Sequence, residues 1–142
     1  MLRLRRSQIE SIHAHATTEY PHECCGIFLG KRGDSGDLVE ECRRATNIEP
    51  ERAADRYLID PAALLRAEKD ARAQGLEVLG YYHSHPDHPA LASATDSARS
   101  WEGYAYMILS VQSGRPAEMA CYVRDPSSEA PRLIPQDFVV IP

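Results

Sequence analysis

The chain has 142 residues, of which 43% are hydrophobic and 26% are charged. This composition is typical of a globular protein with a buried core, and it excludes a disordered or fibrous chain. The length fits one domain, so we expect residues 1–142 to form a single domain. The net charge of −5 argues against a surface that binds nucleic acid or an anionic membrane.

No apolar run approaches the roughly 18 residues that cross a bilayer, so the sequence predicts no membrane span. The basic residues near the start, Arg5 and Arg6 among them, are not followed by the apolar stretch of a signal peptide. The chain has four cysteines, and none of them forms a C-x-x-C pair. We therefore expect a cytoplasmic protein whose thiols are free and buried.

The first part of the chain predicts a helix followed by a hairpin. Ser7 and Glu10 have the spacing of a capping box, which would open a helix that extends to about Thr17. Two segments flank a glycine-rich turn, an apolar run at 25–30 and a second run at 38–45. They are expected to pair as the strands of the hairpin.

The middle of the chain predicts a loop and a second helix. A polar loop is expected at 47–54, followed by a short strand at 57–59. Asp60 and Pro61 are typical of an N-cap and a first helical residue. Gly75 would end this helix.

The remaining segments predict four strands and a short helix. The strands are expected at about 76–83, 104–111, 119–124 and 138–141, and the helix at 93–101. Helices interspersed with hairpin strands predict a mixed α/β (α+β) fold.

The densest chemical signal lies at the end of the strand predicted at 76–83. Side chains alternate along a strand, so His83 and His85 would point to one face with Cα atoms about 6.6 Å apart. Asp96, in the first turn of the next helix, would add an oxygen atom. Two histidines and one carboxylate with an open fourth position are the ligand set of a catalytic zinc site.

These residues also have explanations that need no metal. The pattern from Ser93 to Asp96 is itself a helix-capping box. We expect the capping and ligand roles of Asp96 to exclude each other, so the direction of its side chain should distinguish them. The other four histidines are expected at the surface: His13, His15, His22 and His88.

The joint pattern H-x-H-P, six residues and S-x-x-D, which spans His83 to Asp96, resembles the signature of the JAMM (MPN) zinc isopeptidase family. The segment Pro21–Gly26 resembles the glutamate segment of small prokaryotic members. The order of predicted elements is also similar from Ser7 to Tyr122. The resemblance implies an MPN-like mixed, curved β-sheet flanked by helices, with a cytidine-deaminase-like layered architecture.

The resemblance also implies roles for individual residues. His83, His85 and Asp96 would bind one zinc ion per chain together with a water molecule. Glu23 would act as the general base, and Ser93 would donate a hydrogen bond to the oxyanion. The substrate would be a peptide or isopeptide bond at the C-terminal tail of a ubiquitin-like or sulfur-carrier protein that ends in Gly-Gly. Release of a C-terminal cysteine or of another extension is one example.

An extended Gly-Gly tail suits pairing with a strand edge, which we expect at 47–59. Two other functions stay open: a cysteine hydrolase with Cys24 or Cys25 as nucleophile and His83 as base, and a non-catalytic MPN protein-interaction module. The zinc chemistry of cytidine deaminases is excluded, because the chain lacks H-x-E with P-C-x-x-C.

Overall fold

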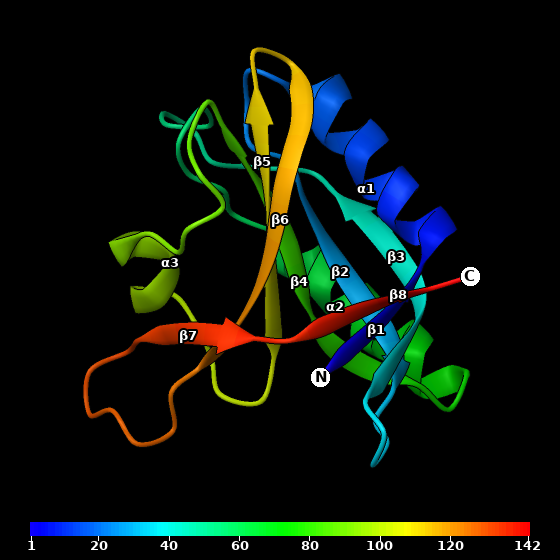
Figure 1. The fold of residues 1–142 in the computed structure, drawn as a ribbon. Helices are drawn as coiled ribbons and strands as arrows, with labels where there is room; N and C mark the ends of the chain where they lie inside the picture. The colour runs from blue at the N-terminus through cyan, green and yellow to red at the C-terminus, as the bar shows by residue number, and fades with distance from the viewer.

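A mixed β-sheet of eight strands forms the centre of the molecule, in a computed structural model that describes residues 1–142 (Figure 1). The strands lie in the order β7-β6-β5-β4-β2-β3-β1-β8. They span Leu2–Arg5 (β1), Cys25–Lys31 (β2), Asp37–Ala45 (β3), Glu77–Pro86 (β4), Ala105–Gln112 (β5), Arg115–Arg124 (β6), Leu133–Gln136 (β7) and Phe138–Ile141 (β8). The helices span Arg6–Glu19 (α1), Pro61–Ala73 (α2) and Ala94–Ala98 (α3).

The two faces of the sheet are covered by different helices. Ile12 of α1 belongs to the largest buried cluster, together with Phe28 and Tyr82. Ala71 of α2 belongs to a separate cluster, together with Leu29. Successive strand residues point to opposite faces, which is why the neighbours Phe28 and Leu29 contribute to different clusters. This arrangement confirms the predicted curved, mixed sheet with helices on its flanks.

The two strands at the edges of the sheet, β7 and β8, follow each other directly in the sequence, so the sheet must curve strongly. β7 pairs antiparallel with β6 at one edge, and β8 pairs parallel with β1 at the other edge. Only Asp137 separates β7 from β8, so the two edges must come close together in a nearly closed sheet. Figure 1 shows the red β8 beside the blue β1, far along the chain but adjacent in space.

The start of α1 differs from the prediction, whereas the start of α2 agrees with it. Ser7 lies inside α1, and the N-cap is Arg5, whose N–H donates to Gln8 Oε1 at 2.8 Å. The Gln8 amide oxygen thus accepts from the N-cap N–H, as the glutamate of a capping box does, while the Arg5 side chain cannot accept in return. Pro61 opens α2, and the Asp60 side chain accepts a hydrogen bond of 2.9 Å from the N–H two residues further on.

Three other differences concern short segments. The strand predicted at 57–59 is absent, because a single bridge between Asn47 and Ile59 is the only ladder contact in the long segment between β3 and α2, here called loop 46–60. α3 is shorter than the helix predicted at 93–101. β1 and β7 were not predicted. None of the three helices has the length and apolar character of a membrane span.

Candidate metal centre and active site

The two predicted histidine ligands lie on the last residues of β4. His83 and His85 are both buried, and their Nε2 atoms lie 3.2 Å apart. Ser84 points to the other face of the strand, where its Oγ accepts a hydrogen bond of 2.8 Å from the N–H of Cys24. The alternation of the strand therefore brings the two imidazoles together, as the sequence predicts.

Asp96 of α3 reaches both imidazoles. Its Oδ1 lies 3.2 Å from His83 Nε2, and its Oδ2 lies 3.1 Å from His85 Nε2. One ligand atom from each of the three residues lies within 4.8 Å of the others, so together they could hold a metal ion.

Asp96 also caps its own helix while it faces both histidines, so the direction of its side chain does not distinguish the capping role from the ligand role, although we expected it to. Asp96 Oδ2 accepts a hydrogen bond of 2.9 Å from the N–H of Ser93, and Ser93 Oγ accepts one of 3.0 Å from the N–H of Asp96. This capping box fixes the side-chain direction of Asp96. The cap thus aims the carboxylate at the histidines.

The hydrogen bonds of His85 allow a test of whether a metal ion fits. Its Nδ1 lies 2.9 Å from the carbonyl oxygen of Pro89, which can only accept, so Nδ1 carries the hydrogen. In the neutral ring, the lone pair of Nε2 then faces Asp96, which also only accepts when ionised. Two such acceptors 3.1 Å apart are held together either by a metal ion or by a proton on Nε2, which the hydrogen bond to Asp96 favours because, despite burial, it raises the pKa of His85.

The spacing of the three side chains also fits zinc. The Nε2 atoms of His83 and His85 lie 3.2 Å apart, and each faces a different oxygen of Asp96, Oδ1 at 3.2 Å from His83 and Oδ2 at 3.1 Å from His85. A tetrahedron with zinc–nitrogen bonds of about 2.0–2.1 Å has an edge of about 3.3 Å. The donor set and its spacing both suit a zinc ion with an open fourth position.

The electrostatics of the cluster keep its carboxylate charged. Burial alone would raise the pKa of Asp96, but hydrogen bonds with His83 and His85 outweigh this effect and hold the pKa below its usual range. Burial lowers the pKa of His83 despite the opposing effect of Asp96. A neutral His83 beside an ionised Asp96 is the protonation state that metal ligands require.

Strand pairing brings Glu23 to the same place. Cys25 lies opposite His83 in the antiparallel pair of β2 and β4. The N–H of Ser84 donates a hydrogen bond of 3.1 Å to the carbonyl oxygen of Cys24, the residue after Glu23. One further step of this register puts Glu23 level with His85. The Glu23 side chain is only 4% exposed, and its Oε1 has no hydrogen-bond partner. Burial raises the pKa of Glu23 to about 8, against the opposing effect of His85.

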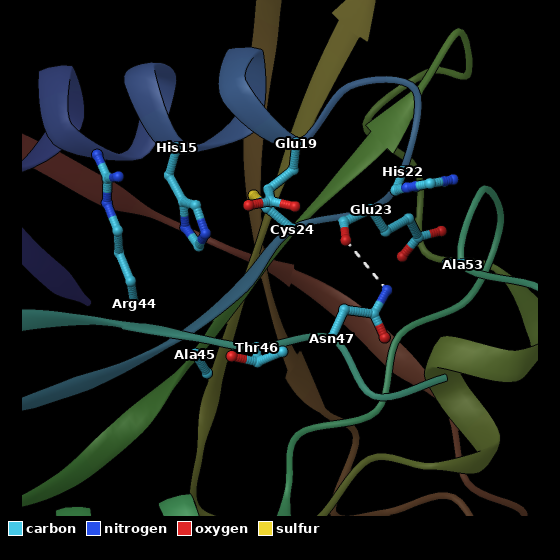
Figure 2. A pocket seen from close by; sticks show the side chains of 10 residues that line it. All are labelled: His15, Glu19, His22, Glu23, Cys24, Arg44, Ala45, Thr46, Asn47 and Ala53. Carbon is cyan, nitrogen blue, oxygen red and sulfur yellow. Dashed lines mark hydrogen bonds between the residues drawn. The ribbon is translucent and has the colours of Figure 1, made fainter. Parts of the chain in front are cut away.

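Loop 46–60 holds the backbone of Glu23 on both sides. The N–H of Glu23 donates to the carbonyl oxygen of Ala53 at 2.7 Å. Asn47 Nδ2 donates to the carbonyl oxygen of Glu23 at 3.0 Å, along the dashed line in Figure 2. Figure 2 also shows the Glu23 side chain pointing away from His15 and Arg44, although all three residues line the same polar cavity of about 320 Å³.

A larger cavity, of about 520 Å³, contains the predicted catalytic groups. Glu23, His85 and Ser93 line it together, although they are far apart in the sequence. Because the Ser93 oxygen accepts the N–H of Asp96, its own hydroxyl hydrogen is free to donate to a bound molecule. His88 lies exposed at the rim of this cavity, as predicted.

The positions of two aromatic side chains were not anticipated. The ring of Tyr57 stacks on the ring of His83, with centroids 4.4 Å apart and an interplanar angle of 23°. His15 was expected at the surface but is buried, with Nδ1 2.7 Å from Tyr82 Oη. Its position on the same helical face as Ile12 was a signal for burial. No signal in the sequence pointed to Tyr57.

The structure contradicts the cysteine-hydrolase alternative. Cys24 and Cys25 are 1% and 0% exposed. Burial raises the pKa of Cys24 to about 11 and that of Cys25 to about 12. Both thiols therefore stay protonated at neutral pH, and a protonated, inaccessible thiol is not a nucleophile.

Comparison with known proteins matches residues 5–124 to the family described as prokaryotic homologs of the JAB domain. A probable TtuB-protein conjugate cleaving protease of Thermus thermophilus is 35% identical over 81% of this chain and 74% of its own length. The desampylase of Haloferax volcanii is 34% identical over 71% of this chain and 74% of its own length. The CysO-cysteine peptidase of Mycobacterium tuberculosis is 30% identical over 86% of this chain and 82% of its own length.

Solved structures show the same fold. A protein of Desulfitobacterium hafniense superposes with a TM-score of 0.84 and 27% identity, over 99% of this chain and 93% of its own. A JAB1/MPN domain protein of Archaeoglobus fulgidus superposes with a TM-score of 0.58 and 16% identity, over 100% of this chain and 98% of its own. At that identity, the second likeness concerns the fold alone.

Proposed function

The chain belongs to the prokaryotic homologues of the JAB domain, and on that premise we propose that it is a zinc-dependent hydrolase of ubiquitin-like or sulfur-carrier proteins. It cleaves a peptide or isopeptide bond at the C-terminal tail of such a protein. The relatives named above are a probable TtuB-protein conjugate cleaving protease, a desampylase and a CysO-cysteine peptidase. All four cysteines are free, which fits the cytoplasmic location that we propose.

One observation carries this proposal: three acceptor atoms converge at the edge of a cavity that is also lined by a buried carboxyl group and a serine hydroxyl. His83, His85 and Asp96 are the proposed zinc ligands. Glu23 and Ser93 line the same cavity as His85. A non-catalytic interaction module would not need the unpartnered, buried oxygen of Glu23, which costs free energy when it has nothing to bind.

Each residue has a separate task in the proposed reaction. Zinc, when bound, makes water nucleophilic at neutral pH and polarises the carbonyl group under attack. Glu23 Oε accepts a proton from the attacking water and passes it to the nitrogen of the leaving amine. Its raised pKa, about 8, suits a group that both accepts and donates a proton near neutral pH. The Ser93 hydroxyl donates a hydrogen bond to the oxygen that becomes negatively charged.

The proposed substrate tail is an extended chain ending in Gly-Gly. Such a tail is narrow enough to enter the cavity of about 520 Å³. The strand edge that we expected at 47–59 for pairing with the tail is not formed, because loop 46–60 contains only one bridge. We therefore propose that the tail is held in the cavity by side chains of this loop and of α3, with Arg56 and Thr95 among them.

The function is tested with a carrier protein that bears a C-terminal extension. We expect the purified protein to contain about one zinc ion per chain and to release the extension, as read by intact mass. Glu23→Gln should retain zinc and lose at least about 100-fold in turnover, because the amide cannot accept the proton. His83→Ala should lose both zinc and turnover. A Glu23→Gln variant with full activity would contradict the role of Glu23.

A further inference from the structure

The two proposed histidine ligands differ in what holds their rings. His85 donates its Nδ1 hydrogen to the carbonyl oxygen of Pro89, an interaction that fixes both the tautomer and the ring orientation. His83 is 1% exposed, yet its Nδ1 has no hydrogen-bond partner. A histidine ligand without such a partner needs another interaction to keep its ring in place.

The ring of Tyr57 occupies the position beside His83 where that support is needed. The two rings are nearly parallel, with centroids 4.4 Å apart. The Tyr57 hydroxyl takes part in none of the hydrogen bonds of the structure. Burial and the nearby Asp96 raise the pKa of this hydroxyl well above its usual value. The contact with His83 is therefore made by the ring face and not by the hydroxyl.

The backbone around Tyr57 is held in place. Asn47 Nδ2 donates to the carbonyl oxygen of Arg56 at 3.0 Å, and the N–H of Leu58 donates to Asn47 Oδ1 at 3.0 Å. These bonds secure the residues on either side of Tyr57. The carbonyl oxygen of Tyr57 itself accepts a hydrogen bond of 3.0 Å from Arg99, just after α3. An aromatic ring on such a backbone can restrain its neighbour.

We propose that Tyr57 is a positioning residue for His83: its ring face takes the place of the missing hydrogen bond to Nδ1 and holds the imidazole in the orientation that binds zinc. This inference rests on the proposed function, since it assigns a new residue to the same metal centre. It also gives loop 46–60 an inward-facing role, in place of the strand edge that the sequence suggested.

Stacking suits a metal-bound imidazole for an electrostatic reason. A ring nitrogen that donates electrons to a cation makes its own ring electron-poor. The face of a phenol or phenyl ring is electron-rich, so it attracts an electron-poor ring better than an aliphatic side chain of similar size does. Phenylalanine should therefore replace Tyr57 without loss, whereas leucine should not.

The test measures zinc affinity directly, by competition of the metal-free protein with a chromophoric chelator. We expect Tyr57→Phe to keep the wild-type dissociation constant within about twofold. Tyr57→Leu fills the space without an aromatic face and should weaken zinc binding about 10-fold, the lower end of the range for loss of a supporting group around a ligand. Leu58→Ala, on the same loop but with a side chain that is 43% exposed, serves as the matched control and should bind as the wild type does.

Thermal unfolding of the metal-free variants separates a local effect from a loss of fold. The inference predicts that Tyr57→Leu and Tyr57→Phe unfold within a few degrees of each other without metal, and that only Tyr57→Phe regains the full stabilisation by zinc. Equal zinc affinity in the wild type, Tyr57→Phe and Tyr57→Leu would overturn the role of Tyr57 and leave the proposed function intact. A wild-type protein that binds no zinc would overturn the proposed function itself.

Discussion

At the scale of single residues, Asp96 and Ser93 depend on each other. The capping box that joins them sets the direction of the carboxylate, and the same box leaves the Ser93 hydroxyl hydrogen free. A substitution of Ser93 can therefore act in two ways, by loosening Asp96 or by removing a donor to the substrate. The choice of substitution decides which of these effects is measured.

Ser93→Gly separates the two effects. Glycine at an N-cap costs only a few tenths of a kcal/mol relative to serine, so Asp96 and the zinc ion that we propose should stay in place. Turnover should fall about 100-fold, because the oxyanion loses one hydrogen-bond donor. Ser93→Thr keeps both the cap and the hydroxyl and is the control. If Ser93→Gly loses zinc in parallel with turnover, Ser93 acts through Asp96 and not on the substrate.

The sequence predicted the side chains of the site better than their surroundings. His83 and His85 could be placed on one face because strand alternation is local. The meeting of Glu23 with His85 depends on pairing between β2 and β4, which nothing within either segment encodes. The stacking of Tyr57 depends on the course of loop 46–60, whose polar sequence has no periodicity to interpret.

At the scale of elements, loop 46–60 depends on Asn47. Its Nδ2 donates to the carbonyl oxygens of Glu23 and Arg56, and its Oδ1 accepts from the N–H groups of Glu49 and Leu58. A single amide thereby satisfies four backbone groups of a segment that has almost no ladder of its own. The loop keeps its shape through this side chain and not through secondary structure.

Asn47→Asp tests this view, because it keeps the acceptor oxygen and removes both donors. The free energy of unfolding should fall by about 2 kcal/mol, since two hydrogen bonds of about 1 kcal/mol each are lost. Trypsin should also cleave faster after Arg52 and Arg56, as followed by mass spectrometry. Ile48→Ala, at an exposed neighbouring position, is the control. Equal cleavage rates in Asn47→Asp and the wild type would show that the loop does not need this amide.

The sequence was less informative about short elements than about long ones. In β1, Leu2 and Leu4 are 1% and 0% exposed, so the alternation of leucine and arginine was a strand signal that was not used. Pro135 argued against β7, but a proline is tolerated there because the strand lies at an edge of the sheet. The true N-cap of α1, Arg5, is not a typical capping residue, and this explains the shift in its start.

At the scale of the whole molecule, the buried thiols make stability sensitive to alkaline pH. Burial raises the pKa of Cys24 to about 11, and those of Cys25, Cys42 and Cys121 to about 12. In an unfolded chain a thiol has a pKa of about 8.5. Above that pH the unfolded chain binds fewer protons than the folded chain, so the free energy of unfolding decreases as pH rises.

We expect this decrease to approach about 1.4 kcal/mol per pH unit for each buried thiol, beginning near pH 8.5. Urea unfolding at pH 8, 9 and 10 measures it. Cys121→Ala removes one buried thiol, so the free energy of unfolding should decrease less steeply with pH, by the contribution of that thiol. Ser113→Ala, at an exposed turn, should leave the pH dependence unchanged. A pH dependence that is the same with and without Cys121 would contradict the prediction.

The pairing of β1 with β8 also bears on how the protein is made. Residues 2–5 leave the ribosome long before residues 138–141, the strand they lie against. Until β8 is synthesised, β1 lacks that partner, and the curved sheet cannot complete its circumference. Pairing between such distant segments is slow, because the chain must first close a very large loop. We therefore expect the pairing of β8 with β1 to be the last step of folding, with the nascent chain dependent on protection from aggregation until then.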